Sequence, residues 1–141
     1  MGHKSDLSLG YYDKSKFIGE VHWNPILFKY MFGVQLDDIK VNGKNLNICS
    51  DRPDGCLITF DSGTSLMSVP SFAHSLLVQN HIPTAHSYQP CENKNQFGDF
   101  TFVINGVDYT LSPDEWMFES QKVNLAQGGA QMTFEMGPLG P

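Results

Sequence analysis

The segment from Phe60 to Leu66 places an acidic side chain at the end of an apolar run and directly before a turn of small residues. Asp61 is that side chain, and a carboxylate that emerges from a protein core has to be satisfied by hydrogen bonds. The nearest donors in sequence are the Gly63 backbone N–H and three hydroxyl groups, which belong to Ser62, Thr64 and Ser65. Gly63 also lets another chain segment or a substrate approach the backbone closely. Asp61 is therefore the first candidate for chemistry.

Other interpretations of the reactive residue types compete with this one. Taken alone, Asp61 can simply accept backbone N–H bonds in an Asx-type turn at a strand end. Ser65 lies in the run Gly-Thr-Ser-Leu-Met, which lacks the final glycine of a serine-hydrolase nucleophile elbow, so we interpret it as a hydrogen-bonding residue. His74 and His81 are seven positions apart, whereas a zinc pair needs closer spacing and further ligands. We expect no metal site and no cofactor.

The elements around Asp61 are predicted to be mainly β-strands, since Val, Ile, Thr, Tyr and Phe are frequent and turn signals recur. Two Asn-Gly pairs, which are strong hairpin signals, predict two β-hairpins. The first joins residues 34–41 to 44–49, and the second joins residues 100–104 to 107–111. Alternation over residues 17–23 predicts another strand with one buried face. Residues 57–60 are predicted to form a short apolar strand that runs into Asp61.

Helical signals are fewer. Ser68 can cap a helix that has Pro70 in its first turn and ends before Pro83. The apolar stripe of this helix consists of Phe72, Ala73, Leu76 and Leu77. A second, shorter helical turn is predicted to begin at Ser112. After Gln121 there is neither periodicity nor a cap, so we expect poor order there.

Length, charge and apolar content narrow the class of protein. The 141 residues suit one domain with a hydrophobic core. The net charge is −6 and the basic residues are scattered, so we expect no nucleic-acid partner. No apolar stretch approaches the roughly 18 residues of a membrane span. Trp23 and Trp116 are interpreted as core residues. Packing in the core and in a cleft, not base stacking, is expected for Phe28, Tyr30, Met31 and Phe32.

Two of the three cysteines enclose a polar turn. Cys49 and Cys56 bracket the sequence Ser-Asp-Arg-Pro-Asp-Gly. A short loop closed by two cysteines is typical of a disulfide at a hairpin tip in an oxidising compartment. The alternative is two free thiols in a cytosolic protein. Cys91 is left over, so it either lacks its partner or stays reduced.

The sequence Phe-Asp-Ser-Gly-Thr-Ser-Leu-Met-Ser-Val-Pro at residues 60–70 resembles the second active-site signature of the two-lobed, pepsin-like (family A1) aspartic proteases. Four more segments resemble this family in the same order along the chain. They are residues 12–25 with Trp23-Asn24-Pro25, residues 35–42, the cysteine loop 49–56 and residues 102–113. The resemblance covers about residues 9–118. This order of motifs is far more specific than Asp-Ser-Gly alone.

The resemblance implies a mainly β fold, namely one lobe of the pepsin-like bilobal acid-protease fold with one or two short helices. It implies that residues 1–141 are the C-terminal catalytic lobe, ordered over about residues 9–120, and that the N-terminal lobe is absent from the chain. A second Asp-Thr-Gly motif does not occur in the sequence. The resemblance also implies the Cys49–Cys56 disulfide.

In this family two aspartates face each other across a cleft, share one proton and hold the water that attacks the peptide bond. The resemblance assigns Asp61 as one of these two aspartates, with no metal involved. The substrate-binding residues that it implies are Ser62, Gly63, Thr64 and Ser65 in the same turn, with Tyr30 and Thr59 as weaker candidates on the primed side. Ser62 and Thr64 are also expected to orient the carboxylate and the bound backbone.

The partners implied are a peptide or protein substrate, the N-terminal lobe of the same protease and pepstatin-like inhibitors. The expected location is the secretory pathway, with the protein extracellular or in an acidic vacuole or lysosome-like compartment, after synthesis as a zymogen. We expect the isolated chain to be inactive, because it carries one catalytic aspartate. Two alternatives stay open. One is a non-catalytic, peptide-binding or truncated lobe, and the other is a homodimeric protease of retroviral type in which each copy supplies Asp61.

Overall fold

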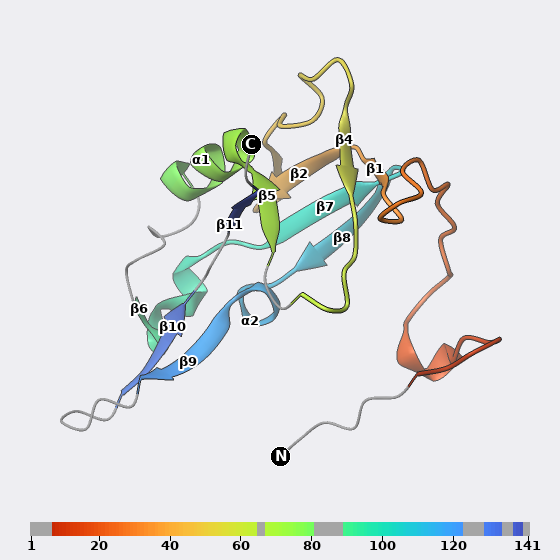
Figure 1. Ribbon diagram of the computed structural model, residues 1–141. Coiled ribbons are helices and arrows are strands. Elements are labelled where there is room, and N and C mark those ends of the chain that lie inside the picture. Colours follow the sequence, from red (N-terminus) through yellow and green to blue (C-terminus); the bar gives the residue numbers. More distant parts are fainter. Residues whose placement is uncertain (1–6, 65–66, 81–88, 123–128, 134–136, 140–141) are drawn as a thin grey trace.

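The computed structural model of the protein describes residues 7–64, 67–80, 89–122, 129–133 and 137–139 (Figure 1). These residues form eleven β-strands and two short α-helices, which confirms the mainly β class expected of a pepsin-like lobe. The strands are β1 (Val34–Leu36), β2 (Asp38–Val41), β3 (Lys44–Asn45), β4 (Cys56–Ile58), β5 (Ser68–Pro70), β6 (Gln89–Pro90), β7 (Phe100–Ile104), β8 (Val107–Leu111), β9 (Phe118–Lys122), β10 (Gly129–Thr133) and β11 (Gly137–Leu139). The helices are α1 (Ser71–Asn80) and α2 (Pro113–Trp116), with 3-10 segments η1 (Lys14–Lys16) and η2 (Cys91–Gln96).

The central sheet has four antiparallel strands in the order β3-β2-β7-β8 and contains both predicted hairpins. The first is shorter than predicted, because residues 34–36 form β1, which pairs with β4, and β3 ends at Asn45. The turn residues 42–43 and 105–106 all have positive φ, between 50° and 75°. Positive φ at both central residues is what a two-residue type I′ turn requires, and Asn-Gly meets this requirement at little cost. The pairing of β2 with β7 then joins the two hairpins, with Val41 opposite Phe100.

The hydrophobic core is built around this sheet. Its buried apolar side chains are Leu36, Ile39, Val41, Ile48, Cys49, Ala73, Leu77, Phe100, Ile104 and Trp116. Trp116, at the end of α2, packs edge-on against Phe100 with ring centroids 4.9 Å apart. Its indole N–H donates to the Gly98 carbonyl at 3.1 Å, so the polar atom of this side chain is satisfied. The interpretation of Trp116 as a core residue is confirmed.

The segment before β1 differs from the prediction. Residues 17–23 form no strand, and Trp23 is 80% exposed instead of buried in the core. The apolar side chains that follow are also exposed, and they are Phe28, Tyr30, Met31 and Phe32. An alternating sequence becomes a strand only beside a neighbouring strand, and no strand in the described part of the chain pairs with residues 17–23. Figure 1 shows this segment, in red to orange, on the outside of the molecule.

Helix α1 begins later than predicted. Residues 68–70 form β5, which pairs in parallel with β11, so Ser68 is not the cap and Pro70 precedes the helix. The residue before a proline favours the extended conformation, and the pairing with β11 keeps all three residues extended. Ala73 and Leu77 are buried as predicted, whereas Phe72 and Leu76 are exposed. The buried stripe therefore contains two of the four predicted side chains.

Regular structure also occurs where the sequence showed no periodicity. After Gln121, β10 pairs with β9 and β6, and β11 pairs with β5. The pairings of β10 with β6 and of β11 with β5 satisfy backbone N–H and C=O groups through partners that are distant in sequence, so local pattern is a poor guide to them. Helix α2 was predicted correctly. The Glu115 carboxylate accepts hydrogen bonds from the Ser112 backbone N–H at 2.8 Å and from its hydroxyl at 2.9 Å.

We predict that Leu77→Ala lowers the free energy of unfolding by about 2–5 kcal/mol, because this side chain is 1% exposed within the core. Leu76→Ala removes the same atoms from the neighbouring position of the helix, where the residue is 38% exposed. We expect a clearly smaller loss for this matched control. Urea unfolding followed by circular dichroism measures both changes. Equal losses in the two variants would contradict the buried face assigned to α1.

Candidate active site

Asp61 lies in an exposed turn beyond the end of β4. The strand covers residues 56–58, so it begins one residue earlier and ends two residues earlier than predicted. It ends at Ile58 because the ladder with β1 ends there, where Ile58 is opposite Val34. Phe60, in the predicted apolar strand, is 74% exposed. Asp61 therefore does not emerge directly from the core, as the sequence had suggested, but stands on a short extension of β4.

The Asp61 carboxylate accepts two hydrogen bonds within its own turn. The Gly63 backbone N–H donates to Oδ1 at 2.9 Å, and the Thr64 hydroxyl donates to Oδ2 at 2.6 Å. The Thr64 backbone N–H closes the turn by donating to the Asp61 carbonyl at 3.2 Å. A Cβ atom at Gly63 would lie 3.2 Å from Asp61 Oδ1, so glycine suits this close approach. Both carboxylate oxygens are thereby oriented by the local chain.

These two donors also determine the acidity of the group. The Thr64 hydroxyl, and after it the Gly63 N–H, hold the pKa of Asp61 below its usual value, because both bond to the charged form. Desolvation acts in the opposite direction and is the smallest effect, since the turn is exposed. Within the described part of the chain, the pKa of Asp61 is therefore lowered by hydrogen bonds, which favour its ionised form.

The loop formed by residues 28–33, which precedes β1, is hydrogen-bonded to Thr59, between β4 and Asp61. The Thr59 hydroxyl donates to the Met31 carbonyl. Phe28 and Gly33 form an isolated antiparallel bridge, which makes residues 28–33 a tight loop. Gly33 lies close to β4, because a Cβ atom there would be 3.8 Å from Leu57 Cδ1. The loop 28–33 therefore lies beside β4 and Thr59, which directly precede the Asp61 turn in the chain.

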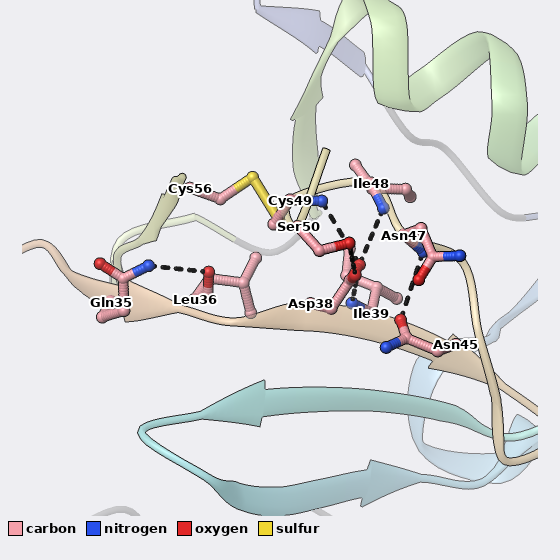
Figure 2. The surroundings of a disulfide bond; sticks show 10 residues. All are labelled: Gln35, Leu36, Asp38, Ile39, Asn45, Asn47, Ile48, Cys49, Ser50 and Cys56. Atoms are coloured by element: carbon pink, nitrogen blue, oxygen red, sulfur yellow. Dashed lines mark hydrogen bonds between the residues drawn. A yellow bond between two sulfur atoms is a disulfide. The ribbon is translucent and has the colours of Figure 1, made fainter. Parts of the chain in front are cut away.

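The other end of β4 is attached through the predicted disulfide. Cys49 and Cys56 are bonded, with a Cα–Cα distance of 5.3 Å, so the pairing is confirmed (Figure 2). Beneath this loop lies the Asp38 carboxylate, which is 3% exposed. Donors from the start of the loop and from the residue before it converge on this carboxylate (Figure 2). They are the Ile48 N–H at 2.9 Å, the Cys49 N–H at 3.4 Å and the Ser50 hydroxyl at 3.1 Å.

The residues singled out from the sequence are distributed unevenly. Ser62, Gly63 and Thr64 share one exposed turn with Asp61, whereas Ser65 lies outside the described residues. Tyr30 is exposed on the loop 28–33, where its ring contacts Phe28 at 6.4 Å between centroids. Thr59 uses its hydroxyl to hold this loop. His74 lies on α1, and His81 is outside the described residues.

Sequence reasoning missed Asp38 altogether. A weak signal was present, since Asp38 lies between Leu36 and Ile39 in a predicted strand, where a buried carboxylate would need several donors. The Met31 carbonyl, which accepts the hydrogen bond from Thr59, left no such signal, because every residue has a backbone carbonyl. Of the described helices, none is long and apolar enough to cross a membrane.

We predict that Thr64→Val raises the pKa of Asp61 towards the ordinary aspartate value, because it removes the hydroxyl that contributes most to lowering it. Ser62→Ala is the matched control, since the two hydrogen bonds described for the carboxylate come from Gly63 and Thr64. The lowered pKa means that the turn is favoured above the unfolded-state pKa and that this contribution is lost as pH falls through the folded-state value. An NMR pH titration of the Asp61 carboxyl carbon measures the midpoint. An unchanged midpoint in Thr64→Val would contradict the assigned hydrogen bond.

Comparisons with known proteins support the resemblance to aspartic proteases. Residues 2–135 match the family described as eukaryotic aspartyl protease. The chain is similar to cathepsin E of Aquarana catesbeiana, with 34% identity over 140 residues, which are 95% of this chain and 34% of that protein. It is also similar to cathepsin E of Oryctolagus cuniculus, with 41% identity over 115 residues, or 79% of this chain and 28% of that protein.

A third relative is gastricsin of Cavia porcellus, which is 29% identical over 135 residues, or 93% of this chain and 33% of that protein. The chain therefore spans about a third of the length of these relatives.

Proposed function

Because the chain belongs to the eukaryotic aspartyl protease family, we propose that residues 1–141 form the C-terminal catalytic lobe of a pepsin-like endopeptidase and supply Asp61 as one of its two catalytic aspartates. The observation that carries this proposal is the Asp61 turn. Asp61 is exposed, and both oxygens of its carboxylate accept hydrogen bonds from Gly63 and Thr64 of the same turn. A second carboxylate and a water could therefore approach it from solvent. An Asx-type turn without a function would not require the surrounding motif order.

The mechanism follows from pairing this group with a second aspartate. Two carboxylates at close range cannot both be ionised comfortably, so they share one proton and hold a water between them. The hydrogen bonds from Thr64 and Gly63 favour the ionised form of Asp61, which suits the carboxylate that takes the proton from the attacking water. The second aspartate then donates its proton to the substrate carbonyl. Peptide hydrolysis proceeds without a covalent intermediate.

The substrate and inhibitor partners are assigned to the surface around this turn. Ser62, Gly63, Thr64 and Ser65 would contact the peptide backbone, and Tyr30 with Thr59 would lie on the primed side. The attachment of the loop 28–33 to Thr59 supports this placement, since it brings exposed apolar side chains beside β4. Pepstatin-like inhibitors, which imitate an extended peptide, would bind the same surface.

The second aspartate would come from an N-terminal lobe, because the relatives are about three times as long as this chain. Most of the exposed large apolar side chains of the described residues lie between residues 7 and 32. Their contact with water is unfavourable. A partner lobe would cover some of them. The alternative of a retroviral-type homodimer is not favoured, since the matching family is the eukaryotic one. A non-catalytic lobe is the alternative that the experiments below would reveal.

The compartment is inferred from the cysteine chemistry. A disulfide persists in an oxidising environment, and the Cys49–Cys56 bond supports passage through the secretory pathway. From there the protein would be extracellular or would reach an acidic vacuole or lysosome-like compartment. Synthesis as a zymogen would protect the cell from the active enzyme.

We predict that Asp61→Asn in the two-lobed protein abolishes peptide hydrolysis, by at least about a thousandfold in kcat, and leaves folding nearly intact. An amide cannot take a proton from the water, whereas an exposed side chain contributes little to packing. Asp54→Asn, which alters an exposed residue of the cysteine loop, is the control with the same chemical change. Ordinary turnover in Asp61→Asn would remove this residue from the mechanism.

We also predict that the 141-residue chain alone does not hydrolyse peptides, because it lacks the second aspartate. A panel of fluorogenic peptides, tested from acidic to neutral pH at several chain concentrations and with pepstatin, measures this. Pepstatin-sensitive activity that rises with the square of concentration would restore the homodimer. Activity that is linear in concentration, from a pure sample, would contradict both the inactive single lobe and the homodimer.

A further inference from the structure

We propose that Asp38 is a positioning residue for Asp61, acting through the loop 48–50, the Cys49–Cys56 disulfide and β4. An effect of Asp38 on catalysis rests on the proposed function of Asp61. Its effect on the position of the Asp61 turn does not, so this effect can be measured in the isolated chain.

Asp38 connects the central sheet to the start of the cysteine loop by hydrogen bonds. It is the first residue of β2 and lies opposite Val103 of β7 in the central sheet. Its Oδ1 accepts from the Ile39, Ile48 and Cys49 backbone N–H groups, at 2.8, 2.9 and 3.4 Å. Loss of this buried acceptor would leave the N–H groups that bond to it without a partner, which costs stability. The position of Cys49 therefore depends on this carboxylate.

The disulfide passes this constraint to the strand before Asp61. Cys56 is the first residue of β4, and β4 pairs with β1 over three residues in a two-stranded sheet. A ladder of this size is at best marginally stable in water. Its position is therefore reinforced at both ends, by the disulfide at Cys56 and by the hydrogen bond from Thr59 to Met31. Asp61 follows two residues after Thr59.

The chain offers a matched control for the carboxylate. Asp37, the adjacent residue, accepts a hydrogen bond from the Gly106 N–H at 2.7 Å and so holds the β7–β8 turn instead of the cysteine loop. A change at Asp37 perturbs the same part of the central sheet. It does not release Cys49.

The first measurement is the equilibrium of the disulfide with a dithiol such as dithiothreitol. In this exchange the protein S–S bond breaks, two protein thiols form and the dithiol is oxidised to its cyclic disulfide. Asp38→Ala frees Cys49 and lowers the effective concentration of the two thiols near each other. We expect the equilibrium constant for reduction to rise about tenfold. Asp38→Asn keeps an acceptor oxygen for the N–H groups and should restore most of the difference, while Asp37→Ala should leave it unchanged.

The second measurement follows the Asp61 turn in the oxidised chain. The Gly63 amide resonance reports the bond from Gly63 to Asp61 as pH is lowered. In Asp38→Ala we expect its titration midpoint to rise towards that of an ordinary aspartate, since the turn is no longer held in place. The Asn variant should stay near the unaltered chain, as should Asp37→Ala.

Movement of both readouts in Asp38→Ala, with rescue by Asn, supports the proposal. A shift in the exchange equilibrium without a change at Gly63 would show that the constraint stops at the disulfide, and it would overturn the proposal. No shift in either would overturn it as well. Where Asp38→Ala does not fold, Ser50→Ala removes one donor, and the same two readouts should move less in the same direction. Failure of the proposed function would appear separately, as absence of peptidase activity in the unaltered two-lobed protein.

Discussion

The antiparallel pairing of β2 with β7 is the constraint on which the candidate active site depends. It joins two hairpins that are far apart in sequence, and it buries Val41 and Phe100 in the same core. Only Asp37 separates β2 from β1, and its backbone N–H donates to the Val103 carbonyl at 2.8 Å. β1 in turn pairs with β4, from which the Asp61 turn extends. The exposed Asp61 carboxylate is thus connected, through β4 and β1, to the central sheet and its buried core.

The burial of apolar side chains is very uneven along the chain. The core draws on β1, β2, β7 and the two helices, whereas the apolar side chains of residues 7–32 are largely exposed. Apolar area stabilises a fold only when it is removed from water, so these residues contribute little to the stability of this chain alone. Their sequence is nevertheless rich in aromatic residues. This distribution supports the proposal that the chain is one lobe of a longer protein.

Sequence analysis succeeded for elements that are specified by neighbouring residues and failed for elements that depend on a distant strand. Both hairpins were predicted because Asn-Gly specifies the turn by itself. Residues 17–23 were predicted wrongly, because alternation says which face would be buried and nothing about whether a partner strand exists. The start of α1 was misplaced because residues 68–70 are held extended by β11, far along the chain.

The same distinction applies to the site. Asp61 and its donors lie within four consecutive residues, so their relation could be foreseen. Asp38 acts on a loop ten or more residues away, and the hydrogen bond from Thr59 to Met31 joins the strand to an even more distant loop. Such contacts arise only once the register of the strands is known.

The lowered pKa of Asp61 bears on what the proposed second lobe would have to contribute to catalysis. A general base works best when its pKa is near the operating pH, and the hydrogen bonds within the turn lower the pKa of Asp61 instead. Alone, such an exposed carboxylate is a weak base. A second carboxylate at close range opposes the loss of the shared proton, and a closed cleft removes the solvent that stabilises the charge. The second lobe would therefore have to supply both a partner acid and the surroundings in which Asp61 becomes basic enough to activate water.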